Sequence, residues 1–289
     1  ASRGLGDVYK RQALNSAGVV HIAYFNESDK TLMFARRESA GVWTIEVVDD
    51  NSDVGEYASL AFDAADVPHI SYYDKSNKDL MYARRLGDGF WNIETVDGDG
   101  DDDDDDSTDV GQHTSIGVEA DGRVHISYYA STGRNLKYAT RSGTGSWTTR
   151  SVDTNGDVGK YSSIAIDGLG RVYISYYDES NKDLRYASQF ILGFWATEAV
   201  DSAGDVGKYS SLALDDLGRP RISYYDEDGK DLKYAVQENG QAWTLRSLDT
   251  DDDVGRYTSI AVDDLGQAHI SYYDSSDKSL KYALVAAPD

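Results

Sequence analysis

Oxygen-bearing side chains recur at every second position in several loops that run into an Asp-Val-Gly motif. Alternating carboxylates in a short loop are the hard oxygen ligands that calcium prefers. The sequence therefore predicts calcium binding at three of these loops. The predicted ligands are Asp49, Asn51 and Asp53; Asp153, Asn155 and Asp157; and Asp249, Asp251 and Asp253. An alternative stays open, in which each Asp only caps the backbone amides of a turn.

Paired Tyr residues offer a second kind of chemistry, the binding of a sugar ring. They recur in an Ile-Ser-Tyr-Tyr motif, and most of this aromatic mass is expected to pack between sheets. The alternative is that hydroxyl groups near the following loops contact a carbohydrate. The predicted ligand-binding residues are His113, Arg134, Tyr129, Tyr177 and Tyr225.

The third copy of the repeat departs from the others in two neighbouring loops. Residues 101–106 are consecutive Asp residues, and His113 and Ala130 replace a Tyr and an Asp of other copies. Adjacent carboxylates repel one another and stay solvated. Two explanations remain open: drift after one insertion, or a specialised site in which His113 and Arg134 are the polar groups and the acidic run is a cation-attracting rim.

No group of residues specifies an enzyme active site. Retaining glycosidases need two nearby carboxylates, whereas the charged residues here recur with the repeat. Four His residues share one column of the repeat and are expected to lie too far apart to hold one metal. There is no Cys for disulfides or thiolate chemistry. We expect a non-catalytic protein, with a glycoside hydrolase or polysaccharide lyase as the alternative.

An internal repeat defines the elements that must position these residues. Ile-Ser-Tyr-Tyr, Asp-Val-Gly and a Trp column recur in one register, at a spacing of about 48 residues. In the fourth copy, period-2 alternation between turn residues predicts strands at residues 161–167, 172–177, 183–187 and 195–200. Four strands in a unit of this length are typical of a propeller blade. Six copies therefore predict an all-β, six-bladed β-propeller with four antiparallel strands per blade.

The order of strands within a blade is also predicted. Small residues such as Ser163 and Ala165 suit the innermost strand, where neighbouring blades approach most closely. A charged column on the fourth strand, which includes Glu46 and Glu198, suits an exposed sheet edge. The chain is expected to run from the innermost to the outermost strand of each blade.

The two ends of the chain differ from the repeat. Residues 13–289 are expected to form a single propeller domain. Residues 1–12 are expected to be non-native sequence or a degraded first strand, because Lys10-Arg11-Gln12 replaces the usual pattern. The last copy stops after its third strand, so the last blade is expected to have three strands.

The repeat resembles those of bacterial sialidase-like propeller proteins with BNR or Asp-box repeats. The shared features are Asp-Val-Gly-x-Tyr-Ser-Ser, Ile-Ser-Tyr-Tyr-Asp and Gly-x-Trp, from about Ala13 onward. In an Asp box, Asp157 and Gly159 would match, but Asn155 stands where Ser or Thr is usual and Tyr161 comes one position early. The resemblance implies the six-bladed architecture and, for the alternative function, a sialidase-like glycoside hydrolase or polysaccharide lyase with its active site on the axial face.

The net charge of −23, from 51 acidic and 28 basic residues, limits the partners. Such a surface repels phosphate backbones and anionic lipids, so nucleic acid and membrane surfaces are excluded as partners. We expect a secreted or cell-surface module whose signal sequence is not part of this chain. Its expected ligand is a carbohydrate or a protein, and calcium is the one cofactor that the sequence suggests.

Overall fold

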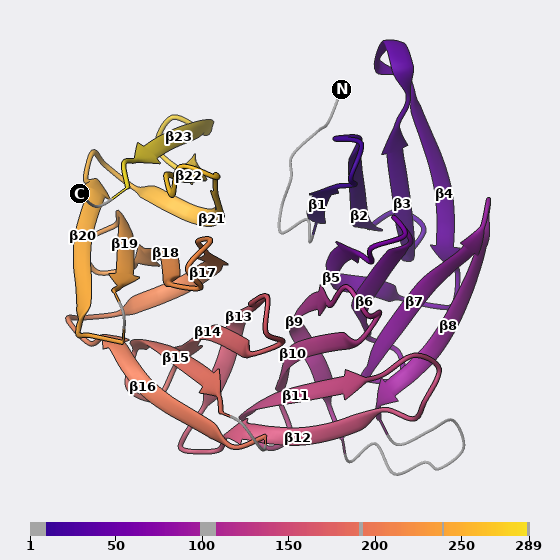
Figure 1. The fold of residues 1–289 in the computed structure, drawn as a ribbon, viewed down its shortest axis with the longest axis horizontal. Coiled ribbons are helices and arrows are strands. Elements are labelled where there is room, and N and C mark those ends of the chain that lie inside the picture. Colours follow the sequence, from indigo (N-terminus) through magenta and orange to yellow (C-terminus); the bar gives the residue numbers. More distant parts are fainter. Residues whose placement is uncertain (1–9, 99–107, 191–192, 239, 288–289) are drawn as a thin grey trace. The chain divides into compact units, whose positions relative to one another are not determined.

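The computed structural model describes residues 10–98, 108–190, 193–238 and 240–287. Within them, 23 strands form six antiparallel sheets, five of four strands and one of three (Figure 1). This confirms the predicted six-bladed β-propeller and its three-stranded last blade. Among these residues, no helix has the length and apolar character to cross a membrane.

The chain divides into two compact units, residues 1–151 and 152–289. The first unit holds the first three blades, and the last strand of the third blade runs on to Asp153. Its strands are β1 (Lys10–Leu14), β2 (Val20–Asn26), β3 (Thr31–Arg37), β4 (Trp43–Asp49), β5 (Val54–Phe62), β6 (Pro68–Asp74), β7 (Asp79–Gly87), β8 (Phe90–Asp97), β9 (Val110–Val118), β10 (Val124–Ala130), β11 (Asn135–Arg141) and β12 (Thr148–Asp153).

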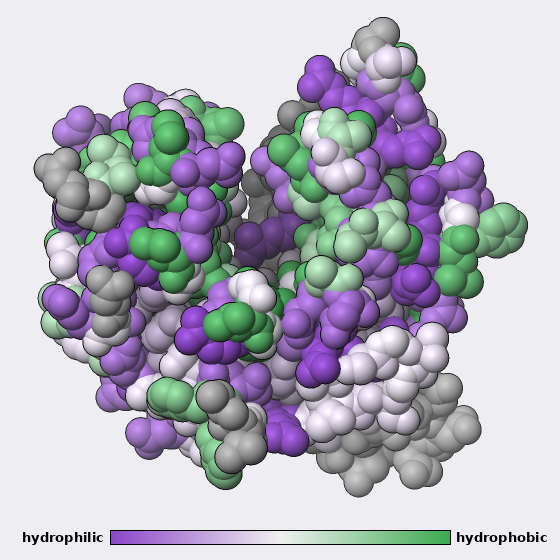
Figure 2. All heavy atoms as spheres, in the orientation of Figure 1, coloured by the Kyte–Doolittle hydropathy of each residue, from purple (hydrophilic) through white to green (hydrophobic). Residues whose placement is uncertain are grey.

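The second unit holds the fourth, fifth and sixth blades. Its strands are β13 (Val158–Ile166), β14 (Val172–Asp178), β15 (Asp183–Gln189), β16 (Trp195–Asp201), β17 (Val206–Leu214), β18 (Pro220–Asp226), β19 (Asp231–Gln237), β20 (Trp243–Asp249), β21 (Val254–Val262), β22 (Ala268–Asp274) and β23 (Ser279–Val285). Figure 2 shows hydrophilic residues over much of the visible face, with separate hydrophobic residues between them.

The second strand of a blade is its most buried element. All seven residues of β14 are buried, and both Ile174 and Tyr176 are fully enclosed. The strand packs against β17 of the next blade, and its alternating side chains are buried on both of its faces. The expected packing of the Ile-Ser-Tyr-Tyr motif between sheets is therefore confirmed.

The first strand of a blade begins earlier than predicted. In the fourth blade it starts at Val158, where residue 161 was expected, because Val158 already pairs with Asp178. The register then shifts twice before Ser163 pairs with Ser175. The shifts form a β-bulge that places Tyr161 in the left-handed region, with a φ of 54°.

Small hydroxyl residues join the first strands of neighbouring blades, as their size predicts. Within the second unit, Ser163 Oγ accepts a hydrogen bond from the backbone N–H of Leu212 at 3.0 Å. Ser211 Oγ accepts one from Ile260 at 3.2 Å, and Ser59 does the same for Ile116 in the first unit. A larger side chain would hold the strands apart.

Buried histidines form hydrogen bonds at the start of the second strand. Nδ1 of His69 lies 2.5 Å from the Tyr82 hydroxyl, and Nδ1 of His125 lies 2.5 Å from the Tyr138 hydroxyl. Nε2 of His125 lies 2.8 Å from a carboxylate oxygen of Glu119. These residues serve a structural role within single blades, as their position in the repeat suggested.

The free energy of unfolding is expected to fall in mild acid because of the buried histidines. Burial lowers the pKa of His69 and His125 in the folded protein, despite the opposing effect of their carboxylate partners. The unfolded chain takes up protons near its pKa of about 6.5. The stabilisation from these groups is therefore present above about pH 6.5 and is lost as the pH falls below it. NMR titration should give folded pKa values below that of the urea-unfolded chain; higher values would contradict the prediction.

Candidate functional site between the fourth and fifth blades

The first Asp of each predicted calcium loop is held by other groups. Asp153 Oδ2 accepts a hydrogen bond from the Tyr176 hydroxyl at 2.7 Å, and its Oδ1 accepts one from the backbone N–H of Asn155. Asp49 is bonded in the same way to Tyr72 and Asn51. Asp249 has the same pair of contacts, with Tyr272 and Asp251. These bonds are those expected of turn-capping carboxylates.

The last Asp of each loop faces a different set of partners. The backbone N–H of Asp157 donates to Ser180 Oγ at 2.8 Å. Asp253 Oδ1 accepts from the Tyr225 hydroxyl and from Arg256 Nε. Asp53 Oδ1 lies 3.9 Å from Lys30 Nζ. Within the part of the chain that the structure describes, no three His, Asp or Glu side chains converge as metal ligands. Calcium binding stays a prediction.

Three residues of the predicted ligand set are buried Tyr side chains. Tyr177 donates its hydroxyl proton to Asp205 at 2.7 Å, and Tyr225 donates to Asp253 at 2.8 Å. The ring of Tyr129 lies 6.4 Å from the ring of His113. Their burial gives these Tyr side chains a packing role.

The remaining two residues of the set belong to repeating columns. His113 has a φ of 52° and lies in the same bulge position as Tyr57, whose ring is 4.5 Å away. Arg134 is exposed, with a φ of 54°, and corresponds to Lys78 and Lys182 in other blades. Arg134 therefore keeps the charge of its column. Residues 101–106 lie outside the described residues, so the third-blade site stays a prediction.

A groove of about 560 Å³ lies between the fourth and fifth blades. Its walls come from β15, β16, the end of β19 and the turns before β14 and β18. All of these segments belong to the second unit. The side chains that line the groove were not predicted from the sequence to form a site.

Aromatic rings line one part of the groove. The rings of Tyr173 and Tyr186 are stacked, with centroids 6.1 Å apart and planes 14° from parallel. Trp243 packs edge-on against Tyr186 at 5.1 Å. Phe190 also lines the groove and is 60% exposed. Tyr173 and Tyr186 are almost fully buried, so Phe190 is the ring of this groove that a ligand can contact most fully.

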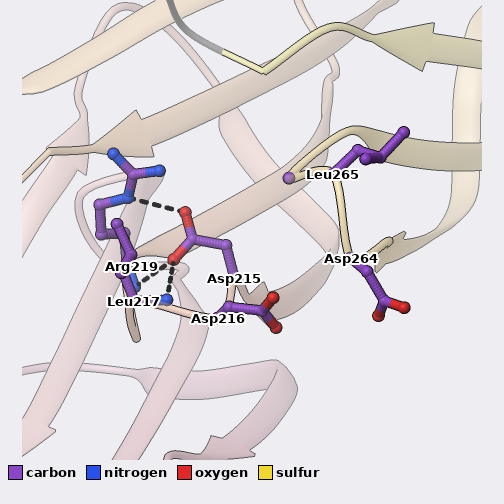
Figure 3. A pocket seen from close by; sticks show the side chains of 7 residues that line it. Asp215, Asp216, Leu217, Arg219, Asp264 and Leu265 are labelled. Carbon is purple, nitrogen blue, oxygen red and sulfur yellow. Dashed lines mark hydrogen bonds and ion pairs between the residues drawn. The ribbon is translucent and has the colours of Figure 1, made fainter.

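Two arginines line the groove, each oriented by the Asp four residues before it. Arg171 Nε donates to Asp167 at 2.6 Å and Arg219 Nε donates to Asp215 at 2.7 Å. Asp215 also accepts bonds from the backbone of its own turn, as Figure 3 shows beside a smaller pocket of about 170 Å³. Burial acts to raise the pKa of Asp215, but hydrogen bonds from Arg219 and Arg221 outweigh it and lower that pKa.

A carboxylate and an amide that line the groove are hydrogen-bonded to each other. Glu198 Oε1 accepts hydrogen bonds from Trp243 Nε1 at 2.9 Å and from Gln237 Nε2 at 3.1 Å. Glu198 belongs to the outer-strand charged column that was expected to protect a sheet edge. The fourth strand is the edge of its sheet, as predicted, and Glu198 on it also bonds to the next blade.

The equivalent position in the first unit is filled by an arginine. Arg85 forms an ion pair with Glu46, and Arg141 forms one with Glu94. The Arg141 guanidinium lies over Tyr82 at 4.9 Å and over Trp147 at 4.5 Å. Gln237 is shorter and neutral, and it leaves the groove of the second unit open.

One signal in the sequence could have found this site. One column near the end of the third strand holds Arg in the first three repeats and Gln in the next two: Arg37, Arg85, Arg141, Gln189 and Gln237. Its partner on the fourth strand of the preceding blade is Glu46, Glu94 or Glu198. Comparing the Arg/Gln column with the Glu column of the preceding blade identifies the fourth and fifth blades, where Glu198 meets Gln237 and no Arg.

No protein-family model matches the chain, and no curated protein matches it. Solved structures share its fold. A lectin of Aleuria aurantia in complex with Fucα1-6GlcNAc has 14% identity and a TM-score of 0.59, covering 98% of this chain and 97% of that chain. The SapL1 lectin in complex with alpha methyl fucoside has 12% identity and a TM-score of 0.62, covering 97% and 96%. An ulvan lyase has 14% identity and a TM-score of 0.67, covering 98% and 81%.

Proposed function

We propose that the protein is a non-catalytic carbohydrate-binding propeller and that the groove between its fourth and fifth blades is the binding site. The observation that carries this proposal is the grouping of stacked aromatic rings, two arginines and a carboxylate in one groove. Sugar rings combine an apolar face with hydroxyl groups, and such a lining offers a partner to each. Two structures of the same fold are lectins solved with fucose-containing ligands.

The two Tyr hydroxyls of the groove are not suited to act as general bases. A general base works best when its pKa lies near the operating pH. Burial raises the pKa of Tyr173 to about 12 and raises that of Tyr186 further. Both hydroxyls therefore keep their protons at neutral pH. A polysaccharide lyase remains the alternative, since one structure of this fold has that activity; release of unsaturated sugars from a polysaccharide would support it.

The groove between the fourth and fifth blades is not repeated at the equivalent positions of the first unit. Arg85 and Arg141 occupy the equivalent position in the first unit and are held there by Glu46 and Glu94. A ligand would have to displace a partly buried ion pair from these positions. We therefore propose that the groove of the second unit is the principal site.

Removal of one exposed aromatic ring tests the groove directly. Phe190→Ala should weaken binding of a glycan-array ligand by roughly two- to tenfold, since an aromatic contact contributes about 0.5–1.5 kcal/mol. Phe194→Ala is the matched control, because Phe194 lies in the same turn, is 70% exposed and does not line the groove. Calorimetry would measure both affinities. Equal affinities for the two variants would place the ligand elsewhere.

A further inference from the structure

The first unit shows which chemical group fits beside the Glu and the aromatic ring of this interface. Arg141 places a guanidinium 4.9 Å from the Tyr82 ring and pairs it with Glu94. Arg85 places one 5.9 Å from the Phe34 ring and pairs it with Glu46. At both positions a guanidinium lies over an aromatic ring and pairs with a carboxylate.

The second unit keeps every part of this arrangement except the cation. Tyr186 and Trp243 meet at 5.1 Å and 74°, as Tyr82 and Trp147 meet at 5.1 Å and 70°. The indole N–H donates to the Glu in both cases, at 2.9 Å from Trp243 to Glu198 and at 3.3 Å from Trp147 to Glu94. Gln237 stands at the Arg position and supplies no charge.

We propose that the groove binds a cationic group of its ligand, held as the arginines are held in the first unit. This inference rests on the proposed function and names the sugar: an amino sugar with a free, protonated amine, such as a glucosamine oligosaccharide. The amine lies beside Trp243 and Tyr186, where Arg141 lies beside Trp147 and Tyr82, and it pairs with Glu198. Cation–π attraction and a charged hydrogen bond both favour it over a neutral sugar.

The charges around the groove agree with a cationic ligand. Arg171 and Arg219 are each paired with a carboxylate, Asp167 and Asp215. Arg219 also pairs with Glu238. These pairs offset the two positive charges of the wall, so Glu198 is left to attract the amine. The net charge of −23 favours the approach of cations to the whole protein.

The test compares a glucosamine tetrasaccharide with its fully N-acetylated form by calorimetry at pH 6.5. The amino form should bind about tenfold more tightly, the effect expected of one partly desolvated cation–π contact and ion pair. Gln237→Arg should abolish that binding, because the new guanidinium takes the place of the ligand amine. Arg141→Gln should add a second site of similar affinity in the first unit.

The possible results separate this inference from the proposed function. If both sugars bind equally and Gln237→Arg removes both, the sugar site stands and the cation preference is overturned. If neither sugar binds but agmatine does, and Gln237→Arg removes it, the cation site stands and the carbohydrate function falls. Unchanged binding of the amino sugar to Gln237→Arg overturns the inference. Circular dichroism checks the fold of each variant. If Arg141→Gln does not fold, the binding measured for Gln237→Arg is sufficient to test the inference.

Discussion

Replacing Asp215 with Ala should lower the free energy of unfolding by about 3–5 kcal/mol, because it leaves a buried guanidinium without its counter-charge. Arg221 is only 1% exposed, and its Nη2 lies 3.0 Å from Asp215 Oδ2. The same carboxylate also accepts hydrogen bonds from the backbone N–H groups of Leu217 and Arg219. One substitution therefore removes an ion pair and the cap of a turn together.

Urea unfolding would measure this loss against a neighbouring control. Asp216→Ala changes an exposed carboxylate in the same turn and should alter stability by less than about 0.5 kcal/mol. Asp215→Ala should also weaken ligand binding, because Asp215 orients Arg219 in the groove. Equal stability of the two variants would show that the Asp215–Arg221 pair does not stabilise the folded state.

Gly207→Ala should cost about 2–6 kcal/mol, the combined effect of backbone strain and overpacking. A Cβ at this position would lie 2.7 Å from the Cα of Leu184 in the preceding blade, and the φ of Gly207 is +106°. The contacting atom belongs to the backbone, which cannot rotate away as a side chain could. The φ of +106° is also unfavourable for Ala, so the strain cannot be relieved locally. This contact explains the Gly of the Asp-Val-Gly motif.

Gly168→Ala is the matched control for this substitution. No atom lies within 4 Å of a Cβ built at Gly168, and its φ is not in the left-handed region. This variant should be neutral or slightly stabilising, by up to about 1 kcal/mol, because Ala reduces the entropy of the unfolded chain. Thermal unfolding would compare the two. Similar melting temperatures for both variants would contradict the close approach of the two blades at Gly207.

The repeat was sufficient to predict the blades and most of their strands. Columns of Ile-Ser-Tyr-Tyr, Asp-Val-Gly and Trp fix which residues share a position, and period-2 alternation fixes the strands. The bulge at Tyr161 was not predicted, because a Tyr in a strand pattern gives no sign of a left-handed φ. That conformation follows from the pairing of Val158 with Asp178, which only the folded sheet shows.

The groove could not be predicted from any single column. It depends on Glu198 of one blade and Gln237 of the next, two residues 39 positions apart that meet only at the blade interface. The charges of the outer strand suggested protection of an edge when they were considered alone. The Tyr pairs were predicted as ligand residues because Tyr recurs in every repeat. In the structure they are buried, and their hydroxyls bond to Asp residues.

Hydrogen–deuterium exchange with and without a bound oligosaccharide tests the location of the site most directly. Exchange reports the backbone that a ligand shields or stabilises. The proposed site predicts slower exchange at residues 186–190, 193–198 and 217–237, with little change at residues 110–118 of β9. Protection centred on His113 and Arg134, with none at the groove, would contradict the account and would favour a site in the third blade.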